Sequence, residues 1–290
     1  MMIKFNKLLH CSQQEVIVYS IKSGRWLHEV KEMDGIEIIT LTPENIGKYG
    51  VCGYKDVQKH VELQRKIEWM KKYQPLGLTI KVLVIEGGGT QGMIEYIPGK
   101  YAHRPVNAEN YIFIHCLFVG FKKEFKEQGF ATLLLSECIS DAKKKGFKGV
   151  AVVTRKGSFM ADNMIFIKNG FEIVDKALPD FELCALKFDE TIANPAFLPI
   201  ALQSSSSDKD MVIYRSAQCP YSVKNVNAIM ESAYSMNIPV KLVEIDDAEK
   251  AQNVPCPFGA FCISYNGKII AHHPISNTRF LNIMKSMKSF

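Results

Sequence analysis

Between residues 111 and 146 an apolar segment, a charged loop and a long amphipathic helix follow one another directly. The apolar segment, residues 111–119, predicts a buried strand. Apolar residues then recur every three or four positions, so one face of the helix should pack on a core. Three lysines followed by Gly146 are typical of a helix C-terminus. The apolar positions of this helix are Ala131, Leu134, Leu135, Cys138, Ile139 and Ala142.

The start of this helix has no strong side-chain cap, so its first backbone N–H groups are available to an anion. Gly129 allows the backbone to approach a pyrophosphate, and Ala131 keeps the first turn small. Lys126 can meet phosphate as a point charge. These features predict a phosphate-binding loop, with an ordinary strand-to-helix connection as the alternative. Its residues are Lys126, Glu127, Gln128, Gly129, Phe130 and Ala131.

This loop resembles the acyl-coenzyme A signature of the GNAT superfamily of N-acetyltransferases, (Arg/Gln)-x-x-Gly-x-(Gly/Ala), with Lys126 at the first position. The resemblance implies that the loop binds the phosphates of acetyl-CoA. It also implies that a backbone N–H group near Leu117 to Val119 polarises the thioester carbonyl.

A second segment resembles the superfamily's Asn…Tyr-x-x-x-Gly-Phe pattern, because Asn163 and Phe166 precede Gly170-Phe171. The resemblance assigns Asn163 and Phe166 to the acetyl-CoA site. In the family the tyrosine often protonates the leaving thiolate, and Phe166 cannot donate a proton.

The order of predicted elements from residue 36 to residue 189 is β-α-β-β-β-α-β-α-β-β. This order predicts an α+β fold with a mixed sheet, and it resembles the acyl-CoA N-acyltransferase fold of GNAT proteins over its whole length. The length of 290 residues favours a second domain. We divide the chain into an extension of undetermined role (1–33), the acetyltransferase domain (34–200), a serine-rich linker (201–210) and a second domain (211–290). Because the linker offers little to bury, we expect the two domains to fold separately.

The second domain has the predicted order β-α-β-x-β-β-α, in which x is an unassigned segment. It resembles a thioredoxin-like domain, with Cys219-Pro220-Tyr221-Ser222 in place of the glutaredoxin C-P-Y-C. A thiol that begins a helix should have a lowered pKa and react readily. Cys219 is therefore a possible redox thiol, and a residue that keeps the fold without the chemistry is the alternative. By resemblance, Pro255 or Pro257 supplies a cis-proline facing it.

The pairing of the two domains resembles the YoaP-type acetyltransferases over residues 36 to about 285. The most specific pieces are residues 95–98, 101–105 and 114–116, together with the tail. This resemblance implies transfer of an acetyl group from acetyl-CoA to the amine of an unidentified acceptor.

A base for this transfer could come from the strand before the phosphate loop. His115 is the favoured candidate by its ordinary pKa, and Cys116 is its neighbour. Because faces alternate along a strand, only one of the two should point into the cleft. Tyr101, His103 and Arg104 either line the acceptor side or belong to an ordinary polar loop.

The composition limits the partners and the cellular location that we expect for the protein. The net charge of +6 comes with acidic residues mixed throughout, so we do not expect a nucleic-acid partner. No apolar run is long enough to span a bilayer, and we expect no membrane association. The eight cysteines show no metal-ligand spacing and favour a reducing cytoplasm. The competing function is a thiol-redox or binding protein that senses acyl-CoA without efficient transfer.

Overall fold

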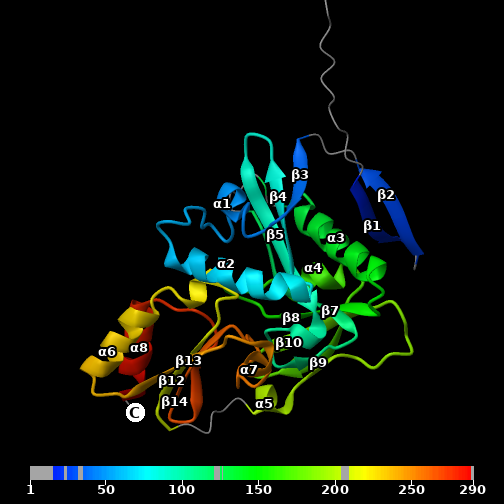
Figure 1. Ribbon diagram of the computed structural model, residues 1–290. Helices are drawn as coiled ribbons and strands as arrows, with labels where there is room; N and C mark the ends of the chain where they lie inside the picture. The colour runs from blue at the N-terminus through cyan, green and yellow to red at the C-terminus, as the bar shows by residue number, and fades with distance from the viewer. Residues whose placement is uncertain are drawn as a thin grey trace, which may run out of the picture.

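A mixed seven-stranded sheet forms the centre of the molecule (Figure 1). The computed structural model describes residues 16–22, 25–31, 35–120, 125, 127–203 and 209–288. The strand order is β3-β4-β5-β7-β8-β10-β9, in which only the β7–β8 pair is parallel. The predicted mixed α+β sheet is confirmed. Its strands are β3 (Ile36–Thr40), β4 (Thr79–Ile85), β5 (Gly89–Pro98), β7 (Tyr111–Val119), β8 (Gly149–Thr154), β9 (Glu172–Ala177) and β10 (Phe181–Lys187).

Helices cover both faces of this sheet, and successive residues of a strand contact helices on opposite faces. Helix α3 (Phe130–Lys144) shares one cluster with Leu83, and α2 (Val61–Tyr73) shares another with Val82. Neighbouring residues of β4 therefore face opposite layers. Helix α3 ends as predicted, because Gly146 has a φ of +77° and the N–H of the next residue bonds Ala142 O. We call the described residues up to 203 the first half and residues 209–288 the second half. The other α-helices of the first half are α1 (Ile46–Tyr49), α4 (Asn163–Ile167) and α5 (Pro199–Leu202).

Residues 209–288 contain a second, four-stranded sheet of order β13-β12-β14-β15. Strands β12 and β13 are parallel, and β14 and β15 run antiparallel as a hairpin. The hairpin turns at Asn266-Gly267, a residue pair typical of two-residue turns, and both residues have positive φ. The elements are β12 (Met211–Arg215), α6 (Val226–Ser235), β13 (Val240–Glu244), α7 (Ala248–Gln252), β14 (Phe261–Tyr265), β15 (Lys268–Ala271) and α8 (Asn277–Lys288).

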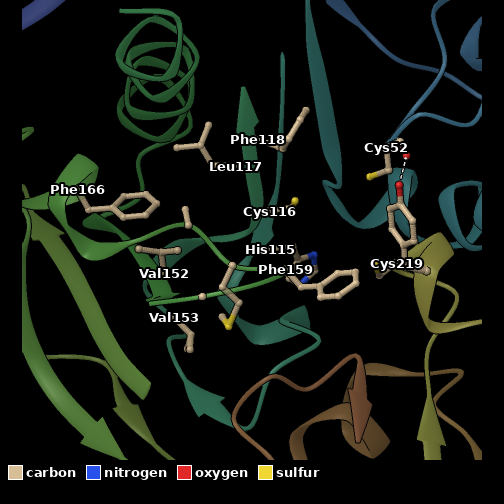
Figure 2. A pocket seen from close by; sticks show the side chains of 14 residues that line it. Cys52, His115, Cys116, Leu117, Phe118, Val152, Val153, Phe159, Phe166 and Cys219 are labelled. Carbon is tan, nitrogen blue, oxygen red and sulfur yellow. Dashed lines mark hydrogen bonds between the residues drawn. The ribbon is translucent and has the colours of Figure 1, made fainter. Parts of the chain in front are cut away.

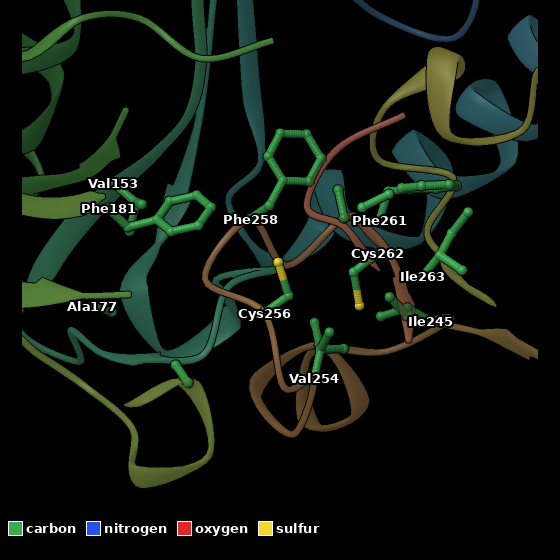
Figure 3. Close-up of a cluster of buried hydrophobic side chains, with 14 of the residues drawn as sticks. Val153, Ala177, Phe181, Ile245, Val254, Cys256, Phe258, Phe261, Cys262 and Ile263 are labelled. Carbon is green, nitrogen blue, oxygen red and sulfur yellow. The ribbon is translucent and has the colours of Figure 1, made fainter. Parts of the chain in front are cut away.

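The two sheets share one hydrophobic core, which Figure 3 shows around Phe181, Phe258 and Cys256. Strand residues such as Val153 join the cluster from the large sheet, while the second half contributes residues of β12, β14, α6 and α8. The expectation that the halves fold separately is therefore not supported. Gly259 marks a close approach, because a Cβ there would lie 2.9 Å from Cα of Arg104.

Short elements complete the fold. A hairpin of β1 (Val16–Lys22) and β2 (Arg25–Lys31) precedes the sheet and lies beside α3 (Figure 1). Strands β6 (Val106–Asn107) and β11 (Ala196–Phe197) form a small antiparallel pair. In the part of the chain that the structure describes, no helix is both long and apolar enough to cross a bilayer.

Candidate functional site

The central parallel pair of strands opens into a wedge. Strand β7 pairs with β8 only from Tyr111 to Ile114, although β7 continues to Val119. On its other edge β7 pairs with β5 as far as Val119, but the register shifts so that Glu95 faces Cys116 and Tyr96 faces Ile114. The extra residue is His115. A β-bulge therefore lies where the two parallel strands separate, as bulges near binding sites commonly do.

A pocket of about 340 Å³ occupies this wedge (Figure 2). Its walls include Cys116 and Leu117 of β7 and Val152 of β8. His115 and Cys116 both line the pocket. The His115 ring is fully buried and contacts His103 and Glu95 behind the pocket, so the expectation that only one of the two side chains points into the cleft stays a prediction. The remaining lining residues are Cys52, Phe118, Val153, Gly157, Phe159, Met160, Ala161, Phe166, Cys219 and Tyr221.

One end of the pocket carries residues assigned to the acetyl-CoA site. Figure 2 shows Phe166 and Leu117 at this end. Phe166 is fully buried and packs edge-on against Phe171. Asn163 does not belong to the described lining, and its amide donates to Glu182 Oε2 at 2.6 Å. Val119 is half-buried beside the α3 core and is also absent from that lining.

The start of α3 keeps an open backbone. Gly129 is its first flanking residue, with a φ of +81°, and the space where its Cβ would stand is empty of described atoms. No described side chain caps the helix, and its first turn carries no acidic residue. Glu127, Gln128 and Gly129 are exposed at this end, whereas Phe130 is buried and Ala131 half-buried. Lys126 lies outside the described residues.

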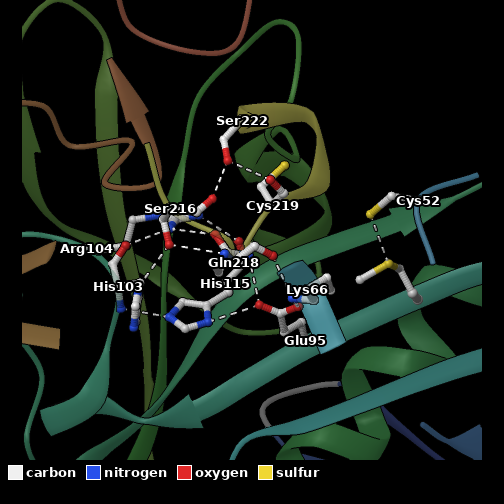
Figure 4. A network of polar contacts seen from close by, with 11 residues as sticks. Cys52, Lys66, Glu95, His103, Arg104, His115, Ser216, Gln218, Cys219 and Ser222 are labelled. Atoms are coloured by element: carbon white, nitrogen blue, oxygen red, sulfur yellow. Dashed lines mark hydrogen bonds and ion pairs between the residues drawn. The ribbon is translucent and has the colours of Figure 1, made fainter. Parts of the chain in front are cut away.

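A buried polar network joins the two halves directly behind the pocket (Figure 4). Lys66 of α2 donates to Glu95 Oε2 at 2.5 Å and to the carbonyl oxygen of Gln218 at 2.6 Å. The Gln218 amide in turn donates to Glu95 Oε1 at 2.8 Å. The Lys66 and Glu95 side chains are each 1% exposed. Burial alone would raise the pKa of Glu95, but Lys66 and His115 outweigh it and lower this pKa to about 2.

The same network holds both ring nitrogens of His115. Its Nε2 accepts the backbone N–H of His103 at 2.9 Å, so Nδ1 carries the proton and faces Glu95 Oε1 at 3.2 Å. Burial lowers the pKa of His115 to about 4, although Glu95 opposes the shift. Arg104 donates to the carbonyl oxygen of His115 at 3.0 Å and to Gln218 Oε1 at 3.2 Å. The bulge residue is therefore fixed by its ring and by its backbone.

Of the residues proposed for the acceptor side, His103 and Arg104 are buried in this network rather than exposed in a polar loop. His103 Nδ1 lies 3.3 Å from the hydroxyl of Ser216, and burial keeps the pKa of this histidine well below its usual range. Tyr101 packs beside the α2 core and does not belong to the described lining of the pocket.

Three half-buried cysteines, Cys52, Cys116 and Cys219, line the pocket, each from a different segment. Burial raises the pKa of the Cys116 thiol to about 12 and that of the Cys52 thiol well above its usual value. Burial also raises the pKa of Cys219, and the backbone N–H of Tyr221 offsets this only in part. The expected lowering at Cys219 is wrong. A single 3₁₀ turn follows Cys219, and α6 begins only at Val226.

The expected cis-proline is also wrong. Both Pro255 and Pro257 follow trans peptide bonds, since the cis bond found among the described residues is Leu178–Pro179. Cys256 is fully buried, and its thiol donates to the carbonyl oxygen of His272 at 3.7 Å. Position 222 holds a serine whose hydroxyl donates to the carbonyl oxygen of Ser216. No group of His, Cys, Asp and Glu among the described residues has the geometry of a metal site.

Sequence reasoning missed Lys66, Glu95 and Gln218 as partners. Two of them carried a signal, because Lys66 falls at the spacing of Leu63 and Tyr73 on the apolar side of α2, and Glu95 interrupts an apolar strand. A charge at a buried position requires a partner. The third came from a distant segment, and nothing local indicated it.

Parts of the chain are similar to known proteins. The model of a family described as YoaP-like matches residues 239–282. The chain is 28% identical over 252 residues to a Bacillus subtilis (strain 168) protein named "Uncharacterized N-acetyltransferase YoaP", covering 86% of this chain and 98% of that protein.

Two solved structures are similar to about half of the chain. One is the PaiA N-acetyltransferase from Thermoplasma acidophilum in complex with coenzyme A, at 18% identity and a TM-score of 0.38, over 53% of this chain and 99% of that one. The other is YncA from Salmonella typhimurium with acetyl-CoA, a putative acetyltransferase by its name, at 15% identity and a TM-score of 0.41. It covers 55% of this chain and 98% of that chain.

Proposed function

We propose that this protein is an N-acetyltransferase of the GNAT type that moves an acetyl group from acetyl-CoA to an amine. The observation that carries the proposal is the wedge at the β7 bulge together with the uncapped start of α3, whose Phe130 shares a core cluster with Leu117 and Phe166 of the wedge. The relative in Bacillus subtilis, named an N-acetyltransferase, supports the same reaction.

The wedge suits an extended thioester. Beyond Ile114, β7 has no partner strand on its β8 side, so backbone groups within Cys116 to Phe118 can face the pocket instead of a ladder. A backbone N–H group there would stabilise the negative charge that develops on the thioester oxygen. The N–H groups at the start of α3, with Gly129, would receive the pyrophosphate.

The reaction needs few proton transfers from side chains. The acceptor nitrogen attacks the acetyl carbon, a C–N bond forms, the C–S bond breaks, and the proton lost by nitrogen ends on the coenzyme A thiolate. Phe166 is fully buried and apolar and cannot supply that proton. Both nitrogens of His115 are engaged, so we assign this residue a positioning role in holding the bulge rather than the role of base.

The second half is included in the proposal as a thioredoxin-like domain without redox chemistry. The β13-β12-β14-β15 order with a parallel β12–β13 pair supports that fold. The raised pKa of Cys219 and the serine at position 222 speak against a reactive dithiol. The division at residues 201–210 and the location in a reducing cytoplasm remain predictions.

The test is the substitution Gly129→Val, which places branched carbon at the start of α3. We expect acetyl-CoA affinity in calorimetry to fall at least about tenfold. Gly146→Val is the matched control, because Gly146 has a similar φ of +77° and open surroundings at the opposite end of the same helix. Equal affinity in the two variants would contradict the phosphate-loop assignment.

A further inference from the structure

We propose that the acceptor is a neutral, weakly basic amine on a flat aromatic or apolar body, bound between the two halves at the thiol-lined end of the pocket. This inference rests on the proposed acetyl transfer and names the substrate class of the same site.

The second half builds one wall of this end. Figure 2 shows Cys52 and Cys219 opposite the end that holds Phe166. Tyr221 donates its hydroxyl to the carbonyl oxygen of Cys52 at 2.9 Å and meets the ring of Phe159 edge-on at 5.6 Å. If acetyl-CoA enters from the Phe166 end, the acceptor meets residues of both halves.

No charged side chain offers an ammonium a partner there. Among its described residues, the pocket lining contains no Asp, Glu, Lys or Arg. The nearby carboxylate, Glu95, is already shared by Lys66, Gln218 and His115. Behind this wall lie two cations, Lys66 and Arg104, and one carboxylate, Glu95, so these three side chains carry a net positive charge. A cationic amine would therefore lose its hydration and meet an unfavourable field.

Among the residues that the structure describes, the pocket has no group placed to remove a proton from an ammonium. His115 has both ring nitrogens engaged, and the three thiols are neutral at physiological pH because burial raises their pKa. An amine that is already neutral needs no such base. Neutral thiols and aromatic rings form an apolar, polarisable surface that suits a flat apolar body.

The experiment compares 4-methylaniline with 4-methylcyclohexylamine, which share size and connectivity but differ in basicity. Full-length protein, shown by calorimetry to bind acetyl-CoA, is incubated with each amine at neutral pH, and the acetylated product is measured by mass spectrometry. We expect kcat/KM to be roughly tenfold or more higher for the aniline. Equal or better use of the cyclohexylamine would overturn the acceptor class and leave acetyl transfer standing.

A negative charge placed at position 219 tests whether electrostatics causes the preference between the two amines. Cys219→Asp should reverse the preference toward the cyclohexylamine, whereas Cys219→Asn, of equal size and neutral, should keep it. If both variants keep the wild-type preference, the electrostatic argument is refuted. If the protein binds acetyl-CoA but acetylates neither amine, the acceptor class is wrong. If it does not bind acetyl-CoA, the proposed function fails and the acceptor class with it. Circular dichroism checks that each variant is folded. If either variant fails to fold, the comparison of the two amines with the wild-type protein still tests the acceptor class.

Discussion

Replacing Glu95 by glutamine should strongly destabilise the whole chain. The substitution leaves the Lys66 ammonium buried without its counter-charge, and breaking such a buried pair typically costs about 3–5 kcal/mol. The pKa of Glu95 gives a similar figure. Its folded value of about 2, against an ordinary value of 4.5, corresponds to about 3 kcal/mol of stability near neutral pH.

The assay is urea unfolding of Glu95→Gln beside the wild type. Glu68→Gln is the matched control, since Glu68 pairs with Lys71 on the exposed surface of α2 and should contribute about 1 kcal/mol or less. The double variant Lys66→Met with Glu95→Gln removes the unpaired cation and should recover part of the loss. If Glu95→Gln loses no more stability than Glu68→Gln, the network does not hold the halves together.

Three further outcomes follow from the same contacts. Stability should fall as pH drops from about 6.5 to 4, because over this range His115 binds its proton only in the unfolded chain. Below about 4.5 the protonation of Glu95 in the unfolded chain adds to the loss. Urea unfolding midpoints that stay constant over this pH range would contradict the prediction. Iodoacetamide at neutral pH should label Cys219 slowly and more slowly still with acetyl-CoA, as peptide mass spectrometry can show; rapid labelling would restore the redox hypothesis. Gly259→Ala should lower the unfolding midpoint read by tryptophan fluorescence, because Trp26 and Trp69 both precede residues 209–288; an unchanged midpoint would mean that the halves unfold independently.

The elements of the large sheet could be predicted because their signals are local. Apolar spacing identified α3, and Gly146 marked its end with a backbone conformation that favours glycine. The Asn266-Gly267 turn was predictable for the same reason.

The site itself depends on contacts that no local pattern encodes. A strict two-residue period could not reveal the bulge at His115, because the extra residue appears only in the register with β5. The pKa of Cys219 was mispredicted because burial in the joint between the halves outweighs its place before a helical turn. Gln218 joins Glu95 across 123 residues of sequence. The shared core could not be inferred from the serine-rich linker, since the contacting surfaces lie elsewhere.

The most direct test of the account is a crystal structure of the full chain with acetyl-CoA. We predict the thioester carbonyl within hydrogen-bond distance of a backbone N–H group in residues 116–119 and the pyrophosphate at the start of α3. The acetyl group should point toward Cys52, Cys219 and Tyr221. Acetyl-CoA bound away from the β7–β8 wedge, or an acetyl group pointing away from the second half, would contradict the account.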